Sequence, residues 1–304
     1  MFTTPGTSSI VVAGAGAAAT LAGTAAVGQT KPAPVALKKA IKYGMIGAGD
    51  SVLAKFELAK KCGFAGVEMD SPSGVDREAA KKAAAATGVV IHGVIDSQHW
   101  GSPLSHPDEK VRDKGYAAMV TAIEDAGFYG TATTMLLVPG VVNKDVTYDQ
   151  CWERSTALVK KALPLAEKAK TPIAIETVWN GFITKPEQMV KYVDQFESKW
   201  VGAYFDASNM IKFGVSSADW IRALGKRMLK FDFKGYSVAL AKKTGKDGDG
   251  FGAKIGEGDE NWPDVLKALA EVGYAGEYFT AEVGGGDEKW LLDVSARMDK
   301  ILGK

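Results

Sequence analysis

From residue 39 onward, short apolar runs alternate with longer stretches in which apolar residues recur every three or four positions. The apolar runs have the length of buried strands and lie at 43–46, 66–69, 89–94, 133–138, 172–176, 201–205, 228–233 and 278–283. The stretches between them have the period of amphipathic helices, as at 158–169 and 265–272. The chain is therefore predicted to be an α/β protein in which strands and helices alternate.

Hydroxyl residues that are followed three positions later by an acid or an amide mark the expected starts of three helices. Such a pair of side chains can satisfy two backbone N–H groups at a helix N-terminus. The three pairs are Ser105 with Asp108, Thr147 with Gln150, and Thr184 with Glu187. A helix is predicted to begin at each of them.

Eight strand–helix units in about 265 residues can close into a (β/α)8 TIM barrel. The alternative is a doubly wound open sheet, which typically carries a glycine-rich fingerprint in the loop after its first strand. Here that loop reads Gly47, Ala48, Gly49, Asp50 and has no third glycine. We therefore expect a single-domain barrel over residues 36–304.

Residues 1–35 differ in composition from the rest of the chain. No acidic residue precedes Asp50, no basic residue precedes Lys31, and residues 10–28 are small and apolar. We interpret this segment as flexible or cleaved, and as an atypical export signal without a basic residue ahead of its apolar run. The protein is then expected to be exported to the periplasm, or to be cytoplasmic if the segment is not a signal. A dinucleotide fingerprint at 14–19 is disfavoured, because no acid follows at the required distance.

Composition and charge exclude several kinds of partner and site. The 37 basic and 36 acidic residues give a net charge of +1, which argues against nucleic acid as a partner. Two cysteines exclude a disulfide scaffold or a Cys-rich zinc module, and the three histidines all lie within 92–106. The many glycines and threonines of the N-terminal segment argue against stable membrane insertion. A small molecule remains as the expected partner, and a homo-oligomer is left open.

The last four predicted strands end in acidic residues, Glu176, Asp206, Asp232 and Glu282. In a TIM barrel the C-terminal strand ends form the active site, so these four side chains are expected to meet. Taken singly, each acid could instead cap the following helix. Four carboxylates buried at one end of a barrel are costly unless a cation compensates them. The sequence therefore predicts a site for one divalent metal ion.

Short segments spread in order over residues 40–300 carry a family resemblance. They include GVEMD at 66–70, IETVWN at 175–180, YFDASN at 204–209 and TAEV at 280–283. With them the chain resembles the sugar phosphate isomerase/epimerase family, the xylose isomerase-like TIM barrels. The resemblance implies one metal held by Glu, Asp, His and Glu of strands five to eight. Glu176, Asp206 and Glu282 match, whereas Asp232 replaces the histidine and Gly235 replaces an acid. An all-oxygen site favours Mn²⁺ or Mg²⁺ over Zn²⁺.

The resemblance implies a metal-dependent sugar isomerase or epimerase that acts through an ene-diolate on a ketose or related keto-sugar. Glu176 and Glu282 would be its acid–base pair. The residues expected to contact a carbohydrate substrate are His99, Trp100, Asn209, Lys234, Glu68, Trp179 and Glu257. Two alternatives stay open. One is a lyase or dehydratase of a keto-sugar, keto-inositol or 3-keto-glycoside at the same site, and the other is a non-catalytic carbohydrate-binding barrel with a degraded metal site.

The segment 237–259 is long and rich in Gly, Lys and Asp. Its order of residues does not match a calcium-binding loop, because Phe251 and Gly252 interrupt the ligand positions. We expect a flexible lid over the mouth of the barrel.

Overall fold

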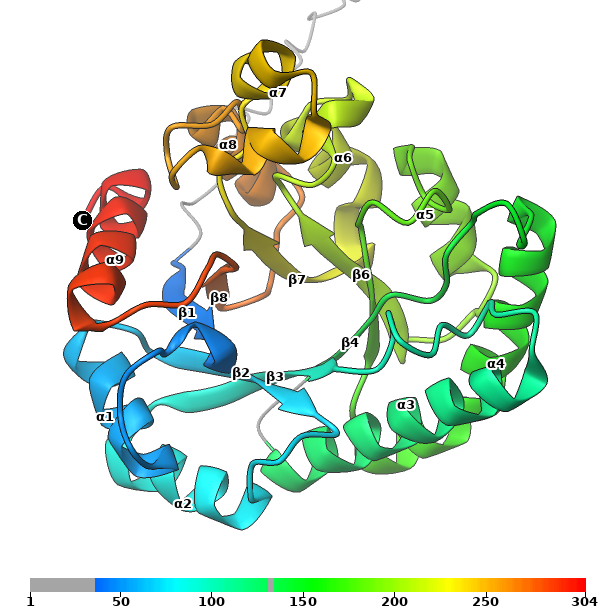
Figure 1. Ribbon diagram of the computed structural model, residues 1–304, viewed down its shortest axis with the longest axis horizontal. Helices are drawn as coiled ribbons and strands as arrows, with labels where there is room; N and C mark the ends of the chain where they lie inside the picture. Colours follow the sequence, from blue (N-terminus) through cyan, green and yellow to red (C-terminus); the bar gives the residue numbers. More distant parts are fainter. Residues whose placement is uncertain (1–35, 131–133) are drawn as a thin grey trace, which may run out of the picture. The chain divides into compact units, whose positions relative to one another are not determined.

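The computed structural model describes residues 36–130 and 134–304. Eight parallel strands pair in sequence order, and the first also pairs with the last, so that the sheet closes into a barrel (Figure 1). The strands are β1 (Lys38–Lys42), β2 (Gly66–Ser71), β3 (Val90–Asp96), β4 (Thr134–Leu137), β5 (Ile173–Glu176), β6 (Val201–Asp206), β7 (Met228–Phe233) and β8 (Tyr278–Ala281). The predicted TIM barrel is confirmed, and the open sheet was the wrong alternative.

The helices lie around the outside of the barrel (Figure 1). They are α1 (Val52–Lys61), α2 (Arg77–Thr87), α3 (Glu109–Tyr129), α4 (Tyr148–Ala169), α5 (Pro186–Asp194), α6 (Ser217–Leu224), α7 (Val238–Thr244), α8 (Trp262–Glu271) and α9 (Glu288–Leu302). No helix in the described ranges combines the length and the apolar character that a membrane span requires. The predictions made for residues 1–35 fall outside the described residues.

The first strand does not lie where its hydrophobic run predicted. Residues 38–42 form β1, and the run expected at 43–46 instead holds a short 3-10 turn, η1 (Tyr43–Met45). An apolar run at 43–46 predicts the strand there, because lysines such as Lys38, Lys39 and Lys42 are mostly exposed in proteins. The Lys42 side chain is nevertheless buried inside the barrel, where its Nζ lies 2.9 Å from Asp232 Oδ2. Acids on other strands thus stabilise a lysine that local patterning places outside.

One of the three predicted helix starts is confirmed and two are wrong. At α4 the Thr147 hydroxyl accepts from Gln150 N at 3.3 Å, and the Gln150 side chain accepts from Thr147 N at 3.0 Å. At α3 the cap is Asp108, and Ser105 instead bonds to the backbone of Val141, accepting from its N–H at 2.9 Å. The loop after β4 therefore competes with the helix for the Ser105 hydroxyl.

The start of α5 lies one residue later than predicted. Its cap position is Lys185, and the side chain that satisfies free N–H groups there is Gln188 rather than Glu187. Gln188 Oε1 accepts from Thr184 N at 2.8 Å and from Lys185 N at 3.0 Å.

The segment 237–259 is not the open loop that its composition predicted. It forms α7 and a 3-10 helix, η4 (Asp247–Gly252). Phe251 packs against Trp179 at 4.9 Å and Tyr236 at 4.9 Å between ring centroids. These aromatic contacts order a segment whose glycines and charges suggested a mobile lid.

The main core lies between the outer face of the barrel and the helices. An aromatic cluster joins β7, β8 and α8, with Phe233 stacked on Phe279 at 3.9 Å and edge-on to Trp262 at 4.9 Å. Inside the barrel, the buried apolar cluster is small and comprises Leu136, Ala174 and Tyr204. Much of the barrel interior is therefore left to polar side chains.

Charged side chains of β7 point into the barrel. They belong to Lys230 and Asp232, two residues apart on the strand, and to Lys234, which follows it. Lys230 Nζ lies 3.3 Å from the His92 ring, Asp232 pairs with Lys42, and Lys234 Nζ lies 2.7 Å from Asp206 Oδ2. This spacing of two residues follows from the strand, whose successive side chains point to opposite faces. A barrel interior usually consists of branched apolar residues, whereas here β7 adds charged side chains, two of them paired with opposite charges.

Stability is expected to fall with pH because of Asp96 at the end of β3. Burial raises the pKa of this carboxyl from 3.8 to about 7, although Gln98 N donates a hydrogen bond to it. The folded state thus holds the proton more tightly than the unfolded state, so stability declines between these pKa values and is flat above them. The Asp96→Asn variant has no ionisable group at this position. From about pH 4 to about pH 7, the free energy of unfolding of the wild type should therefore fall by about 3 kcal/mol relative to that of the variant. Urea unfolding at several pH values checks this, and parallel curves for the two proteins would contradict it.

Candidate active site

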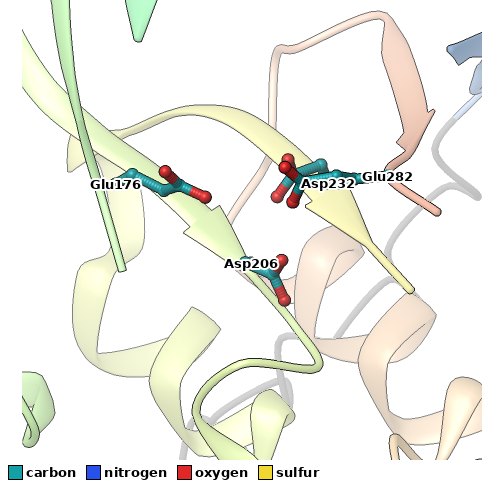
Figure 2. A group of neighbouring side chains, drawn as sticks. All are labelled: Glu176, Asp206, Asp232 and Glu282. Atoms are coloured by element: carbon teal, nitrogen blue, oxygen red, sulfur yellow. The ribbon is translucent and has the colours of Figure 1, made fainter. Parts of the chain in front are cut away.

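Four carboxylates from consecutive strands meet at the C-terminal end of the barrel. Glu176 and Asp206 end β5 and β6, Asp232 lies on β7, and Glu282 follows β8. One oxygen of each lies within 4.8 Å of one oxygen of every other, and Figure 2 shows the side chains turned toward a common centre. The structure thus brings together the four acids that the sequence singled out. We call them the four-acid cluster.

The backbone beyond β6 fixes the orientation of Asp206. Its Oδ1 accepts from the backbone N–H groups of Ser208 and Asn209, both at 2.7 Å. Asn209 is itself held by its Nδ2, which donates to the Thr177 carbonyl at 3.1 Å. The second oxygen, Oδ2, is left to face the cluster. The strand end and the tight turn after it therefore direct one oxygen of the Asp206 carboxylate, Oδ2, into the site.

Two lysines lie among the acids. Lys234 Nζ lies 2.7 Å from Asp206 Oδ2 and also donates to Glu282. Lys42 Nζ lies 2.9 Å from Asp232 Oδ2 and 3.8 Å from Glu282 Oε1. Four carboxylates therefore face two ammonium groups.

Sequence analysis missed Lys42. The first strand was predicted to begin at residue 43, which left this lysine in the preceding loop. The signal that could have found it is its position between Ile41 and Tyr43, because a charged residue between two large apolar residues at a strand end is a candidate for the barrel interior. Burial lowers the pKa of Lys42 by itself, but Asp232 and the other nearby carboxylates outweigh this and hold it well above its usual value.

The two glutamates have pKa values shifted in opposite directions. Burial, and then the neighbouring Glu282 carboxylate, raises the pKa of Glu176. Burial would also raise the pKa of Glu282, but Lys234 and Lys42 outweigh it and lower that pKa. One carboxyl is therefore kept protonated beside one that is kept ionised. Such a divergence is typical of an acid and a base in one active site.

A cavity of about 120 Å³ opens beside the cluster at the mouth of the barrel. Four residues predicted to contact substrate line it together with Glu176 and Glu282, namely His99, Trp100, Asn209 and Lys234. Lys42, Ile95, Leu136 and Val178 complete the lining. The His99 side chain is uncharged at neutral pH, because burial lowers its pKa to about 4. Trp100 packs edge-on against His99 and is 50% exposed, so its ring is open to the cavity and to solvent.

Three other predicted substrate residues do not line this cavity. Glu68 is buried deeper in the barrel, where both of its oxygens accept from the Tyr204 hydroxyl at 2.9 and 3.0 Å. Trp179 donates its ring N–H to the Asn209 carbonyl and packs on Phe251. Glu257 lies 2.7 Å from Arg297, beside a separate hollow between α8 and α9.

The four-acid cluster fits a divalent metal ion. Its carboxylates outnumber the ammonium groups that face them, so the cluster retains negative charge when ionised. Asp232 is fully buried, and neither of its oxygens receives a well-directed hydrogen bond from the described residues, although Lys42 lies close to one of them. Carboxylate oxygens are the donors that Mg²⁺ and Mn²⁺ prefer.

Gly235, the position where the resemblance leads one to expect an acid, leaves no room for a side chain. A Cβ there would lie 2.5 Å from the Ala253 carbonyl oxygen and 2.6 Å from that of Lys254. Gly235→Ala is therefore expected to lower the free energy of unfolding by about 1–3 kcal/mol. Gly248→Ala is the control, because a Cβ there meets nothing within 4 Å. Urea unfolding measures both, and equal stability of the two variants would contradict the prediction.

Comparison with known proteins adds a family and several relatives. A model of the family described as xylose isomerase-like TIM barrel matches residues 56–300. L-ribulose-5-phosphate 3-epimerase UlaE of Salmonella paratyphi A is 25% identical over 257 residues, covering 78% of this chain and 86% of that protein. The same enzyme of Escherichia coli O1:K1 / APEC is 26% identical over 253 residues, with the same coverage.

Solved structures share the fold. D-psicose 3-epimerase from Clostridium cellulolyticum H10 superposes with a TM-score of 0.70 at 20% identity, over 87% of this chain and 98% of that one. The apo form of 3-keto-D-glucoside 4-epimerase YcjR from E. coli gives a TM-score of 0.72 at 14% identity, over 88% of this chain and all of that one, 100%.

Proposed function

Because the chain belongs to the family of xylose isomerase-like TIM barrels, we propose that it is a divalent-metal-dependent epimerase of an uncharged ketose or related keto-sugar. It is an enzyme of the sugar isomerase type, as its curated relatives are sugar 3-epimerases. The observation that carries the proposal is the four-acid cluster, with its oxygens within 4.8 Å of one another beside a cavity. Glu176, Asp206 and Glu282, with Asp232 beside them, form the cluster that would hold the ion.

The glutamates supply the proton transfers. Ionised Glu282 takes the proton from the carbon next to the carbonyl, and the electron pair moves onto the carbonyl oxygen to give an ene-diolate. Protonated Glu176 then returns a proton to the same carbon from the opposite face, which inverts that centre. A bound divalent ion supplies positive charge that polarises the carbonyl. After one turnover the two carboxyls have exchanged protonation states, so a proton must return through the open cavity.

The charges of the cavity favour a sugar without a phosphate. Among the described residues that line it, the cations are Lys42 and Lys234, and both are paired with carboxylates. His99 adds no charge at neutral pH. A phosphate group is normally bound by several cations that are free to meet it. Here Lys42 stays paired inside the barrel, and Lys234 is the single cation of this lining that a bound metal ion could free. The phosphate in the name of the UlaE relatives therefore has no evident counterpart here.

The test is turnover of a ketohexose and of its 6-phosphate by the Mn²⁺-loaded protein in D₂O. The uncharged ketose should exchange its proton and epimerise, with kcat/KM about 100-fold above that of the phosphate, which corresponds to about 3 kcal/mol. Protein treated with a chelator should be inactive until Mn²⁺ is restored. Equal or faster turnover of the phosphate would contradict the substrate assignment, and activity without metal would contradict the metal requirement.

A further inference from the structure

The Lys42 ammonium is fixed from within the barrel. Its side chain is only 9% exposed, and its Nζ lies 2.9 Å from Asp232 Oδ2 and 3.4 Å from Glu68 Oε2. Glu68 is in turn held by the Tyr204 hydroxyl, and the Tyr204 ring faces Lys42 Nζ at 5.2 Å. Moving this ammonium would remove the closest cation of two buried carboxylates. Lys42 is therefore a permanent cation of the site.

The second lysine is held differently. Lys234 pairs with Asp206 and Glu282 from the mouth of the barrel, and its side chain is 17% exposed. Phe251 is the aromatic neighbour of its ammonium, at 5.8 Å. Lys234 is therefore the lysine nearer to solvent, and we expect it to be the one that moves when another cation enters the cluster. The two lysines thus differ in which carboxylates they leave free to bind a metal ion.

This difference bears on Asp232. A carboxylate that is already paired with a fixed cation is a poor ligand for a second one, because the two positive charges would be brought close together in a buried site. Among the described residues, no ammonium lies within 4 Å of Glu176. If Lys234 moves, Asp206 loses its paired cation, and Glu282 keeps only Lys42, at 3.8 Å. Glu176, Asp206 and Glu282 are therefore better placed to hold an ion than Asp232, whose Oδ2 lies closest to the fixed ammonium.

Resting on the proposed function, we propose that Asp232 positions Lys42 instead of ligating the metal, and that the Lys42 ammonium binds the substrate oxygen that becomes negative when the neighbouring proton leaves. An ammonium has three N–H groups, and Asp232 and Glu68 are the described carboxylates within 3.5 Å of it, with Glu282 Oε1 next at 3.8 Å. Lys42 lines the cavity beside Glu282, so an N–H group not directed at Asp232 or Glu68 is the one that would meet a substrate oxygen there. In the step, Glu282 gains the proton, the carbonyl oxygen gains the electron pair, and Lys42 keeps its own proton while donating a hydrogen bond.

The metal assignment is tested by calorimetric titration of the full-length chain with Mn²⁺, which needs no activity. Asp206→Asn and Glu176→Gln should weaken Mn²⁺ binding at least about tenfold. Asp232→Asn and the charge-matched Lys42→Met/Asp232→Asn should bind it within about threefold of the wild type. If Asp232→Asn loses Mn²⁺ as severely as Asp206→Asn does, the positioning role of Asp232 is overturned.

The role of Lys42 is tested by kinetics on the Mn²⁺-loaded variants. Removing a donor to a developing oxyanion typically lowers kcat by about 100- to 1,000-fold, and we expect this for Lys42→Met and for the double variant. Lys42→Arg should recover part of kcat, because it restores a cation at the same place. An unchanged kcat in a folded Lys42→Met or double variant overturns the role. If the wild type turned over no sugar, the proposed function would be wrong. The Mn²⁺ titrations would still show whether Asp232 is a metal ligand.

Discussion

Glu282→Gln is expected to lower kcat by about 100- to 10,000-fold, the range that a positioned general base contributes. The variant keeps the shape of the side chain but cannot accept a proton. Its partner variant Glu176→Gln should be impaired to a similar degree, because Glu176 holds the proton that is returned. Both are measured as sugar epimerisation and as uptake of solvent deuterium by the Mn²⁺-loaded protein.

The control for this experiment lies at the other end of the same strand. Glu277 precedes β8 and forms an exposed ion pair with Lys38 at 2.8 Å, far along the barrel from the four-acid cluster. Glu277→Gln should keep full activity. Retention of more than about a tenth of the activity by both site variants would exclude the two-carboxylate mechanism, since an acid–base pair contributes more than that.

Phe233→Ala should lower the free energy of unfolding by about 3–5 kcal/mol, the range seen when a buried aromatic side chain is removed. Phe233 is fully buried and lies at the centre of the aromatic cluster, against Phe279, Trp262 and Phe231. Neighbours on two strands and one helix cannot all close the space that it leaves. Urea unfolding, compared at equal m-value, measures the loss.

Leu292→Ala is the matched control for stability, because Leu292 is 46% exposed on α9. It should change the free energy of unfolding by less than about 0.5 kcal/mol. A loss below about 1 kcal/mol in Phe233→Ala would mean that the cluster repacks and that β7 and α8 are not held together by it.

The barrel and most of its site could be predicted from the amino-acid sequence. The alternation of short apolar runs with helical periods is a local property, and it located strands β2 to β8 to within a few residues. The ends of β5 to β8 carry Glu176, Asp206, Asp232 and Glu282, and parallel strands in a barrel place such ends on one rim. The four-acid cluster therefore followed from patterning and topology together.

Which other charged residues join that cluster depends on contacts that form only in the folded barrel. Lys42, placed in a loop by its charge, is buried because acids distant in sequence, Asp232 and Glu68, lie within 3.4 Å of it. Glu257 follows a glycine-rich stretch, as a binding loop would, but it faces Arg297 outside the cavity. The physical reason is that local patterning reports the hydrophobic preference of a residue. The position of a buried charge is instead set by the sum of its interactions with charges that only the closed barrel brings near it.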